Sequence, residues 1–233
     1  YSPLLGLYYD KNNEYTIPFS WEVYGLGINT DYFDGKTPHA SWDLLFDPSV
    51  SPQKVGMLDD AREIVSVAAL YLFGKKNRSL NAAQLKELEK LLIEQKKRVV
   101  MYTDLRTDYM LVSDTAPVVM GITSDIYQAM RKYKNIKFLL PKEGSFVVID
   151  TFMIPDSSDK EELVYKFLNY LYQPKIMEKY ADRYNFFPAL KGVASSKDRY
   201  MLSPTKSLFS RLRFFTYAIP EKVLRDIWIT LKA

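Results

Sequence analysis

Apolar and polar positions follow two kinds of pattern along the chain. Short apolar runs bounded by turn-forming residues are typical of buried strands, and apolar residues spaced three or four apart indicate helices that pack by one face. The first pattern predicts strands at 19–29, 55–58, 99–102, 117–122 and 136–140. The second predicts helices at 41–46, 58–74, 81–98, 123–133, 157–172 and 220–233.

Strands that alternate with helices at this spacing form βαβ units, which predicts an α/β fold with a largely parallel sheet. In such sheets, ligands bind beyond the carboxyl ends of the strands. Asp60 and Glu63 follow the strand at 55–58, and Asp125 follows the strand at 117–122, where it is expected to help cap a helix. We therefore expect these three acids to lie along the same edge of the sheet.

The acidic stretch Leu58–Glu63 has two interpretations. An Asp at the N-cap with Glu three residues later satisfies free backbone donors in a capping box. Alternatively, Asp60 and Glu63 lie on one helical face and reach the same ligand ammonium. The spacing alone is compatible with both.

Asp150 interrupts the apolar stretch 145–155. Burying a carboxylate is costly unless the group is paired or hydrogen-bonded. Asp150 is therefore expected either to be solvated at the wall of a cleft or to be matched to a cation.

The composition narrows the possible chemistry. The chain has no Cys and a single histidine, His39, in the polar loop 37–40. Thiolate catalysis and disulfides are excluded, and a His-based triad or multi-His metal site is not expected. We expect His39 at the surface and no metal or cofactor. The net charge of +4 comes from interleaved residues rather than a basic face, which argues against nucleic acid as a partner.

The hydropathy and the first residues of the chain indicate whether it carries a membrane span or a signal peptide. No apolar run reaches the roughly 18 residues expected of a membrane span. No signal peptide pattern is visible, and the chain opens at Tyr1 without Met, so a processed or truncated beginning is expected.

Carboxylates and aromatic side chains remain as the candidate chemistry, and the chain carries 18 Tyr, 13 Phe and 3 Trp. A pair of carboxylates can hydrolyse glycosides. Acids and aromatic rings at strand ends also suit a small organic cation, because carboxylates pair with ammonium groups and ring faces lie along the spacer or the charge. No glycine-rich phosphate loop is present.

Several motifs occur in a fixed order along the whole chain: Tyr15–Trp21, Gly25–Asn29, Ser41–Leu45, Gly56–Glu63, Pro141–Ser145, Ile149–Asp150, Ile154–Pro155 and Ile227–Ala233. In these motifs the chain resembles the periplasmic spermidine/putrescine-binding proteins of ABC importers, the PotD/PotF-like group of type II solute-binding proteins. The block Leu58–Glu63, Leu-Asp-Asp-Ala-Arg-Glu, is the most specific of them.

The resemblance implies a two-lobed α/β fold with mixed, mainly parallel sheets and a two-strand hinge. It also implies that an N-terminal stretch of the family, which supplies most of the first lobe, is missing from this chain. The expected division is 1–28 for the end of the first lobe and the hinge strand, 29–148 for the second lobe, 149–203 for the return to the first lobe, and 204–233 for C-terminal helices on the second lobe.

The resemblance also implies ligand-binding residues. Asp60 and Glu63 match the amine-binding acids of the second lobe, with Asp59 expected to cap the helix and leave both free. Asp125 matches the acid after the family's Trp-x-Gly motif, and Asp150 matches the acid on the returning hinge strand.

The aromatic positions depart from the family pattern. Ile122 and Val148 stand where the family has Trp, and Phe214 falls near a ligand-contacting Gln. A lost stacking face costs about 1–2 kcal/mol on the cation–π scale, so weaker affinity or a shifted ligand preference is expected.

Three residues near the first hinge strand complete the expected ligand site. Trp21 remains as an aromatic platform, and Glu22 and Tyr24 are unusual at their positions and are expected to compensate.

The resemblance thus implies a monomeric, non-enzymatic substrate-binding component that captures a polyamine in an interlobe cleft and delivers it to an ABC permease in the inner membrane. The implied location is the periplasm, or the outer side of the cytoplasmic membrane for a lipoprotein. Two alternatives stay open: a carboxylate-dependent glycoside-processing enzyme, and a surface interaction protein that kept the fold but changed or lost its ligand.

Overall fold

The computed structural model describes residues 4–50, 54–74, 79–104, 106–193, 202, 205–215 and 219–232. Tyr1 and Ala233, which begin and end the chain, lie outside these ranges. Within them, no helix is both long and apolar enough to cross a bilayer.

The chain divides into two compact units. Unit 1 comprises Tyr1–Glu22 and Val147–Ser210, and unit 2 comprises Val23–Phe146 and Arg211–Ala233. The chain therefore changes unit after residues 22, 146 and 210, whereas the lobe boundaries expected from the sequence fall after residues 28, 148 and 203. The assignment of these segments to the lobes of the family stays a prediction.

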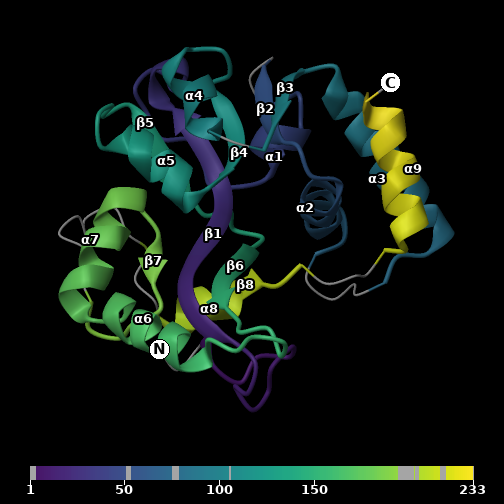
Figure 1. The fold of residues 1–233 in the computed structure, drawn as a ribbon. Coiled ribbons are helices and arrows are strands. Elements are labelled where there is room, and N and C mark those ends of the chain that lie inside the picture. The colour runs from purple at the N-terminus through teal and green to yellow at the C-terminus, as the bar shows by residue number, and fades with distance from the viewer. Residues whose placement is uncertain are drawn as a thin grey trace. The chain divides into compact units, whose positions relative to one another are not determined.

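The sheet of unit 2 is mixed. It contains the second part of β1 (Ile17–Asn29), β2 (Val55–Leu58), β3 (Val99–Thr103), β4 (Val118–Ile122) and β5 (Ile136–Leu139). β2 runs parallel to β3 and β4, whereas β1 runs antiparallel to β4 and β5 (Figure 1). All residues of β2 are buried, as its unbroken apolar run predicts. The α/β class and the mixed sheet predicted from the sequence are confirmed.

Helices cover this sheet. They are η2 (Thr30–Phe33, a 3-10 turn), α1 (Asp43–Phe46), α2 (Ala61–Phe73), α3 (Ala82–Lys96), α4 (Thr107–Val112), α5 (Thr123–Met130) and α9 (Glu221–Lys232). α9 packs against both α2 and α3, and Figure 1 shows it beside α3. Nζ of Lys232 in α9 lies 2.6 Å from Asp59, so the end of α9 lies beside the acidic helix start. The start of β6 (Ser145–Phe152) pairs in parallel with β8 (Leu212–Arg213).

Two glycines of β1 let neighbouring segments come close to the strand. A Cβ at Gly25 would lie 2.4 Å from the ring of Phe138 and 2.8 Å from the carbonyl oxygen of Leu139. A Cβ at Gly27 would lie 2.5 Å from Ile126. Side chains at these positions would push β5 and α5 away, so the absence of a Cβ at Gly25 and Gly27 allows this close approach.

Unit 1 contains the first part of β1 and the second part of β6. Its other elements are α6 (Glu161–Leu171), α7 (Pro174–Tyr184), β7 (Phe187–Pro188) and most of α8 (Lys206–Arg211). Met177 and Ala181 of α7 are buried with Phe186, and Phe19 of β1 packs against them. β7 pairs antiparallel with β1.

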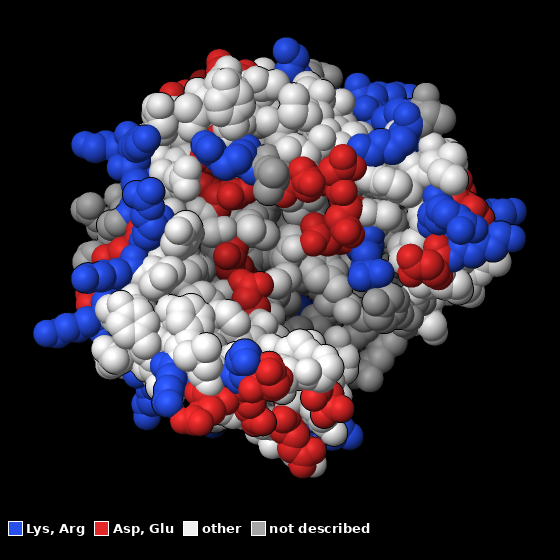
Figure 2. All heavy atoms as spheres, viewed as in Figure 1, with Lys and Arg blue, Asp and Glu red and all other residues white. Residues whose placement is uncertain are grey.

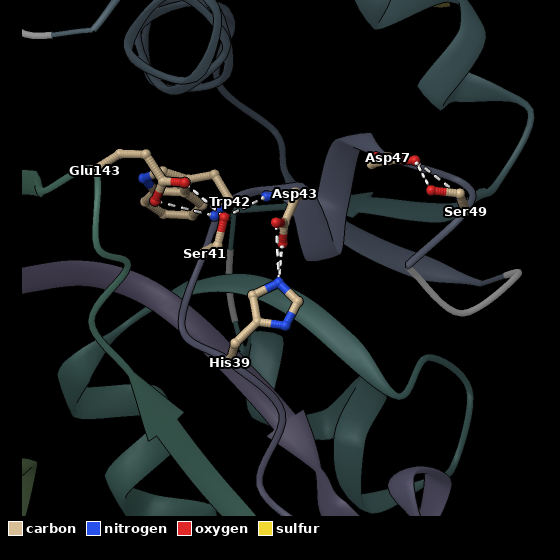
Figure 3. A network of polar contacts seen from close by, with 7 residues as sticks. All are labelled: His39, Ser41, Trp42, Asp43, Asp47, Ser49 and Glu143. Atoms are coloured by element: carbon tan, nitrogen blue, oxygen red, sulfur yellow. Dashed lines mark hydrogen bonds and ion pairs between the residues drawn. The ribbon is translucent and has the colours of Figure 1, made fainter.

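His39, the single histidine of the sequence, belongs to a network of polar contacts in unit 2 (Figure 3). His39 Nε2 lies 2.9 Å from the carboxylate of Asp43, and 53% of its side chain is exposed. The hydroxyl of Ser41 donates to Glu143 at 2.5 Å, and the indole N–H of Trp42 donates to the carbonyl of Gly144 at 3.0 Å. The predicted surface position of His39 is confirmed, and its loop is tied to residues 143–144.

Candidate functional site

The acids that open α2 have different partners. Asp60 is the N-cap, with extended backbone at φ −136° and ψ 121°, and its Oδ1 accepts from the backbone N–H of Glu63 at 3.0 Å. The expectation that Asp59 caps the helix and leaves Asp60 free is therefore wrong. The N–H of Asp59 still donates to the carbonyl of Thr103 at 3.0 Å, so the strand pairing continues through Asp59 and the chain turns one residue later.

Asp59 instead forms an ion pair with the C-terminal helix. Its Oδ1 lies 2.6 Å from Nζ of Lys232 in α9. This negative charge is therefore already matched within unit 2.

Glu63 points toward β1. Its Oε1 accepts from the hydroxyl of Tyr24, whose own ring is buried and meets Phe215 edge-on at 4.9 Å. Burial is the main cause that raises the pKa of Glu63 to about 7, and the negative charge of Asp60 raises it further. The hydrogen bond from Tyr24 and the positive charge of Arg62 act in the opposite direction. Near neutral pH this carboxyl is poised between its two protonation states, so a nearby cation would favour the ionised form.

Asp125 lies in the first turn of α5, and the N-cap of that helix is Ile122, which makes no side-chain cap bond. The expected capping role is therefore wrong. Oδ2 of Asp125 accepts from the backbone N–H of Thr107 at 3.2 Å and from its hydroxyl at 3.4 Å. Burial raises the pKa of this half-buried carboxyl, the Thr107 bonds oppose the rise, and the charge of Asp108 adds to it.

The neighbourhood of Asp125 also holds a basic residue. Arg106 adopts a left-handed conformation (φ 61°), and its guanidinium forms two hydrogen bonds to Asp108, at 2.8 and 3.1 Å. Asp108 is buried, so this two-point pairing satisfies a charge that would otherwise be costly to bury.

The acids of unit 2 share one edge of the sheet. β2 and β4 run parallel, with Gly56 opposite Val119, so Asp60 and Glu63 after β2 and Asp125 after β4 follow strand ends of the same edge. This confirms the prediction from strand order. Figure 2 shows acidic side chains gathered over the part of the surface where α2 lies in Figure 1.

Three further predicted site residues, Trp21, Glu22 and Asp150, belong to unit 1, whereas Tyr24 belongs to unit 2. Asp150 is exposed and accepts from the hydroxyl of Ser20 at 2.5 Å. Of the two alternatives for Asp150, the solvated one therefore describes this structure. Glu22 is half-buried on β1.

Trp21 is placed differently from the expectation. Its ring is 2% exposed and stacks on Phe187 at 4.3 Å with an angle of 27° between the planes, and Phe209 lies 5.2 Å away. Ring faces that pack on neighbouring aromatics are not open to a ligand. This favours a packing role for Trp21 in the core of unit 1.

Sequence reasoning missed the partners of the acids. Lys232, Thr107 and Ser20 were not selected, and each lies far along the chain from the acid that it contacts. Lys232 and Ser20 each belong to a motif of the resemblance, which was the available signal for these two partners.

We expect Asp60→Asn to preserve the start of α2, because Asn caps as well as Asp, whereas Asp60→Ala should lower the free energy of unfolding by about 1 kcal/mol. If the main role of Asp60 is capping, Asp60→Asn should weaken binding of the polyamine that the resemblance implies by less than about tenfold. Urea denaturation and calorimetry on both variants measure the two effects. A larger loss of affinity with unchanged stability would contradict the capping assignment.

Comparison with known proteins identifies the family. The family described as bacterial extracellular solute-binding proteins matches residues 2–202. The chain belongs to this family. The resemblance to its spermidine/putrescine-binding members is also confirmed.

Two curated relatives illustrate the similarity. The chain is 31% identical over 191 residues to the putrescine-binding periplasmic protein SpuD of Pseudomonas aeruginosa, covering 76% of this chain and 52% of SpuD. It is 26% identical over 200 residues to the putrescine-binding periplasmic protein PotF of Escherichia coli, covering 79% of this chain and 54% of PotF. The chain thus spans about half the length of these relatives.

Two solved structures share the fold. The spermidine/putrescine ABC transporter substrate-binding protein PotD of Streptococcus pneumoniae superimposes with a TM-score of 0.78 at 18% identity, over 98% of this chain and 72% of that one. The TpPotD lipoprotein of Treponema pallidum gives 0.73 at 19% identity, over 96% of this chain and 70% of that one. The predicted fold class is confirmed.

Proposed function

We propose that the protein is the substrate-binding component of an ABC importer and that it binds a polyamine such as putrescine or spermidine through carboxylates. The relatives named for putrescine support this choice of ligand class. Both of those relatives are periplasmic proteins, and the pneumococcal PotD is a substrate-binding protein of an ABC transporter. These relationships support delivery to a membrane permease and a location outside the cytoplasmic membrane. The protein is proposed to bind its ligand and not to transform it.

Glu63 carries the proposal. It is a half-buried carboxyl at the carboxyl-terminal edge of a parallel strand pair, which is where α/β sheets bind ligands. Its pKa of about 7 means that the surrounding structure gives the negative charge too little compensation. A ligand ammonium would supply that compensation through a charge-assisted hydrogen bond.

The other acids are assigned supporting roles. Asp59 is matched by Lys232, and Asp60 is engaged as the helix cap, so neither is proposed as the primary partner of the amine. Asp125 and Asp150 are proposed as ligand contacts on the strength of the resemblance. Glu22, which departs from the family pattern, is proposed as a compensating ligand contact. Tyr24 is proposed to act through its hydrogen bond to Glu63, which orients the carboxylate.

We expect putrescine and spermidine to bind and the neutral analogue 1,4-butanediol not to bind, because only the amines carry the charge that Glu63 needs. The affinity should rise with pH. Below about pH 7 the ammonium must displace a proton from Glu63, so the dissociation constant should increase by up to about tenfold per pH unit as the pH falls. Isothermal calorimetry at about pH 6 and pH 8, in buffers of different ionisation heat, measures both the affinity and the protons released.

Each result of this experiment has a distinct meaning. Proton release at the lower pH that disappears at the higher pH supports Glu63 as the amine partner. Binding of both amines without any pH dependence would support the ligand class and contradict the role of Glu63. Heat with neither amine at either pH would contradict the polyamine proposal as a whole.

A further inference from the structure

The ammonium of Lys232 lies among three groups from separate parts of unit 2. Nζ is 2.6 Å from Oδ1 of Asp59, 4.6 Å from the centre of the Tyr102 ring and 4.8 Å from the centre of the Trp228 ring. The two rings meet edge to face, 5.6 Å apart at 81°. Asp59 follows β2, Tyr102 belongs to β3, and Trp228 lies one turn before Lys232 on α9.

This arrangement has the chemistry of an ammonium-binding site. Aromatic faces within about 6 Å attract a cation through the ring quadrupole, and a carboxylate adds a charge-assisted hydrogen bond. The pKa of Tyr102 is raised by burial and by the charge of Asp59, in keeping with their proximity. About two fifths of the side chains of Asp59 and Lys232 stay exposed, at 39% and 38%, so a small solute can reach the site from water.

We propose that Asp59, Tyr102 and Trp228 form an aromatic cage for a primary alkylammonium group, filled in this structure by the chain's own Lys232. The cage fastens the end of α9 to the edge of the sheet that carries Glu63. Because α9 packs against α2 and α3, its docking then depends on an ammonium in the cage. The proposal does not rest on polyamine transport, since the occupant belongs to the chain itself.

The cage also explains why Asp59 and Asp60, adjacent at the start of α2, have different partners. An ammonium within the cage neutralises Asp59, and Asp60 is engaged in capping. Adjacent acids of one motif therefore have separate roles, and a soluble amine that approaches Glu63 does not compete for Asp59.

Chemical rescue tests the cage. Lys232→Ala keeps Cβ and removes three carbons and the ammonium, which n-propylammonium can replace. We expect the variant to melt about 2–4 °C lower than the unmodified protein, the shift typical of a loss near 1 kcal/mol in a chain of this size. Millimolar n-propylammonium should restore the melting temperature in a saturable manner, and 1-propanol should not.

Matched variants separate rescue from a general salt effect. Lys222 lies exposed on the same helix, so Lys222→Ala should melt like the unmodified protein and should not respond to n-propylammonium. Adding Asp59→Asn to Lys232→Ala should abolish the rescue. An equal response in all variants, or no loss of stability in Lys232→Ala, would overturn the proposal.

A measurement on the unmodified protein covers the case in which Lys232→Ala does not fold. Ring currents from Tyr102 and Trp228 should shift the ε-methylene protons of Lys232 upfield of those of Lys222 in NMR spectra. Coincident signals from the two lysines would equally overturn the cage.

Discussion

Glu63→Gln is expected to weaken binding of putrescine by roughly 30- to 150-fold, which corresponds to about 2–3 kcal/mol. The change removes the negative charge and keeps the size of the side chain. The amide oxygen can still accept from the hydroxyl of Tyr24, so the local geometry should survive. Calorimetry at about pH 8, where Glu63 is largely ionised in the unmodified protein, measures the loss.

Glu63→Gln should weaken ligand binding but increase the stability of the folded protein. The pKa of Glu63 rises from its ordinary 4.5 to about 7 on folding, so the folded state favours the protonated form. The stability that this group contributes is complete below 4.5 and is lost as the pH rises through about 7. Glu63→Gln should therefore be more stable than the unmodified protein at about pH 8, by about 1–2 kcal/mol after allowance for the partial exposure of the group, and equal to it at about pH 4.

Glu87→Gln is the matched control, since Glu87 is exposed on α3 of the same unit. It should alter neither the affinity nor the pH dependence of urea denaturation. Equal affinities for Glu63→Gln and Glu87→Gln would remove Glu63 from the ligand site. A gain in stability of Glu63→Gln without a loss of affinity would mean that Glu63 is a destabilising buried carboxyl that does not contact the ligand.

Trp21→Ala is expected to cost about 3–5 kcal/mol of unfolding free energy, the range for removing a large buried aromatic side chain. The ring is 2% exposed and stacks on Phe187, so its removal leaves a cavity beside β7. Urea or thermal denaturation followed by circular dichroism measures the loss. An effect near zero would mean that the ring does not contribute to the core of unit 1.

Trp21→Phe distinguishes packing from ligand stacking. It retains an aromatic ring next to Phe187 and should lose much less stability than Trp21→Ala. If Trp21 acts only in packing, Trp21→Phe should bind putrescine within about threefold of the unmodified protein. A folded Trp21→Phe protein with a tenfold or larger loss of affinity would restore the stacking role that the resemblance implies.

The relation between the two acids of α2 illustrates the limit of local reasoning. The sequence offered a cap and a ligand pair as alternatives, and the resemblance favoured a free Asp60. In the structure, Asp60 caps and Glu63 turns to Tyr24. The deciding fact is that strand pairing extends to Asp59 through a bond to Thr103, which no spacing within residues 58–63 encodes.

The amino-acid pattern alone predicts the fold class, the edge of the sheet where the acids lie and many of the elements, whereas helices α4 and α7 were not predicted. Buried strands such as Val55–Leu58 and helix ends such as Gly74 carry their signals within a few residues, because burial and backbone conformation act locally. The order of parallel strands then places the following acids on one side without any knowledge of contacts.

The partner of each charged side chain is set by the packing of the folded chain. Lys232 reaches Asp59, Tyr24 reaches Glu63 and Ser20 reaches Asp150 across long separations in sequence. Such pairs depend on how helices and strands pack, and side-chain type alone does not specify them. Burial, which also arises only on packing, raises the pKa of Glu63 and withdraws the Trp21 ring from solvent.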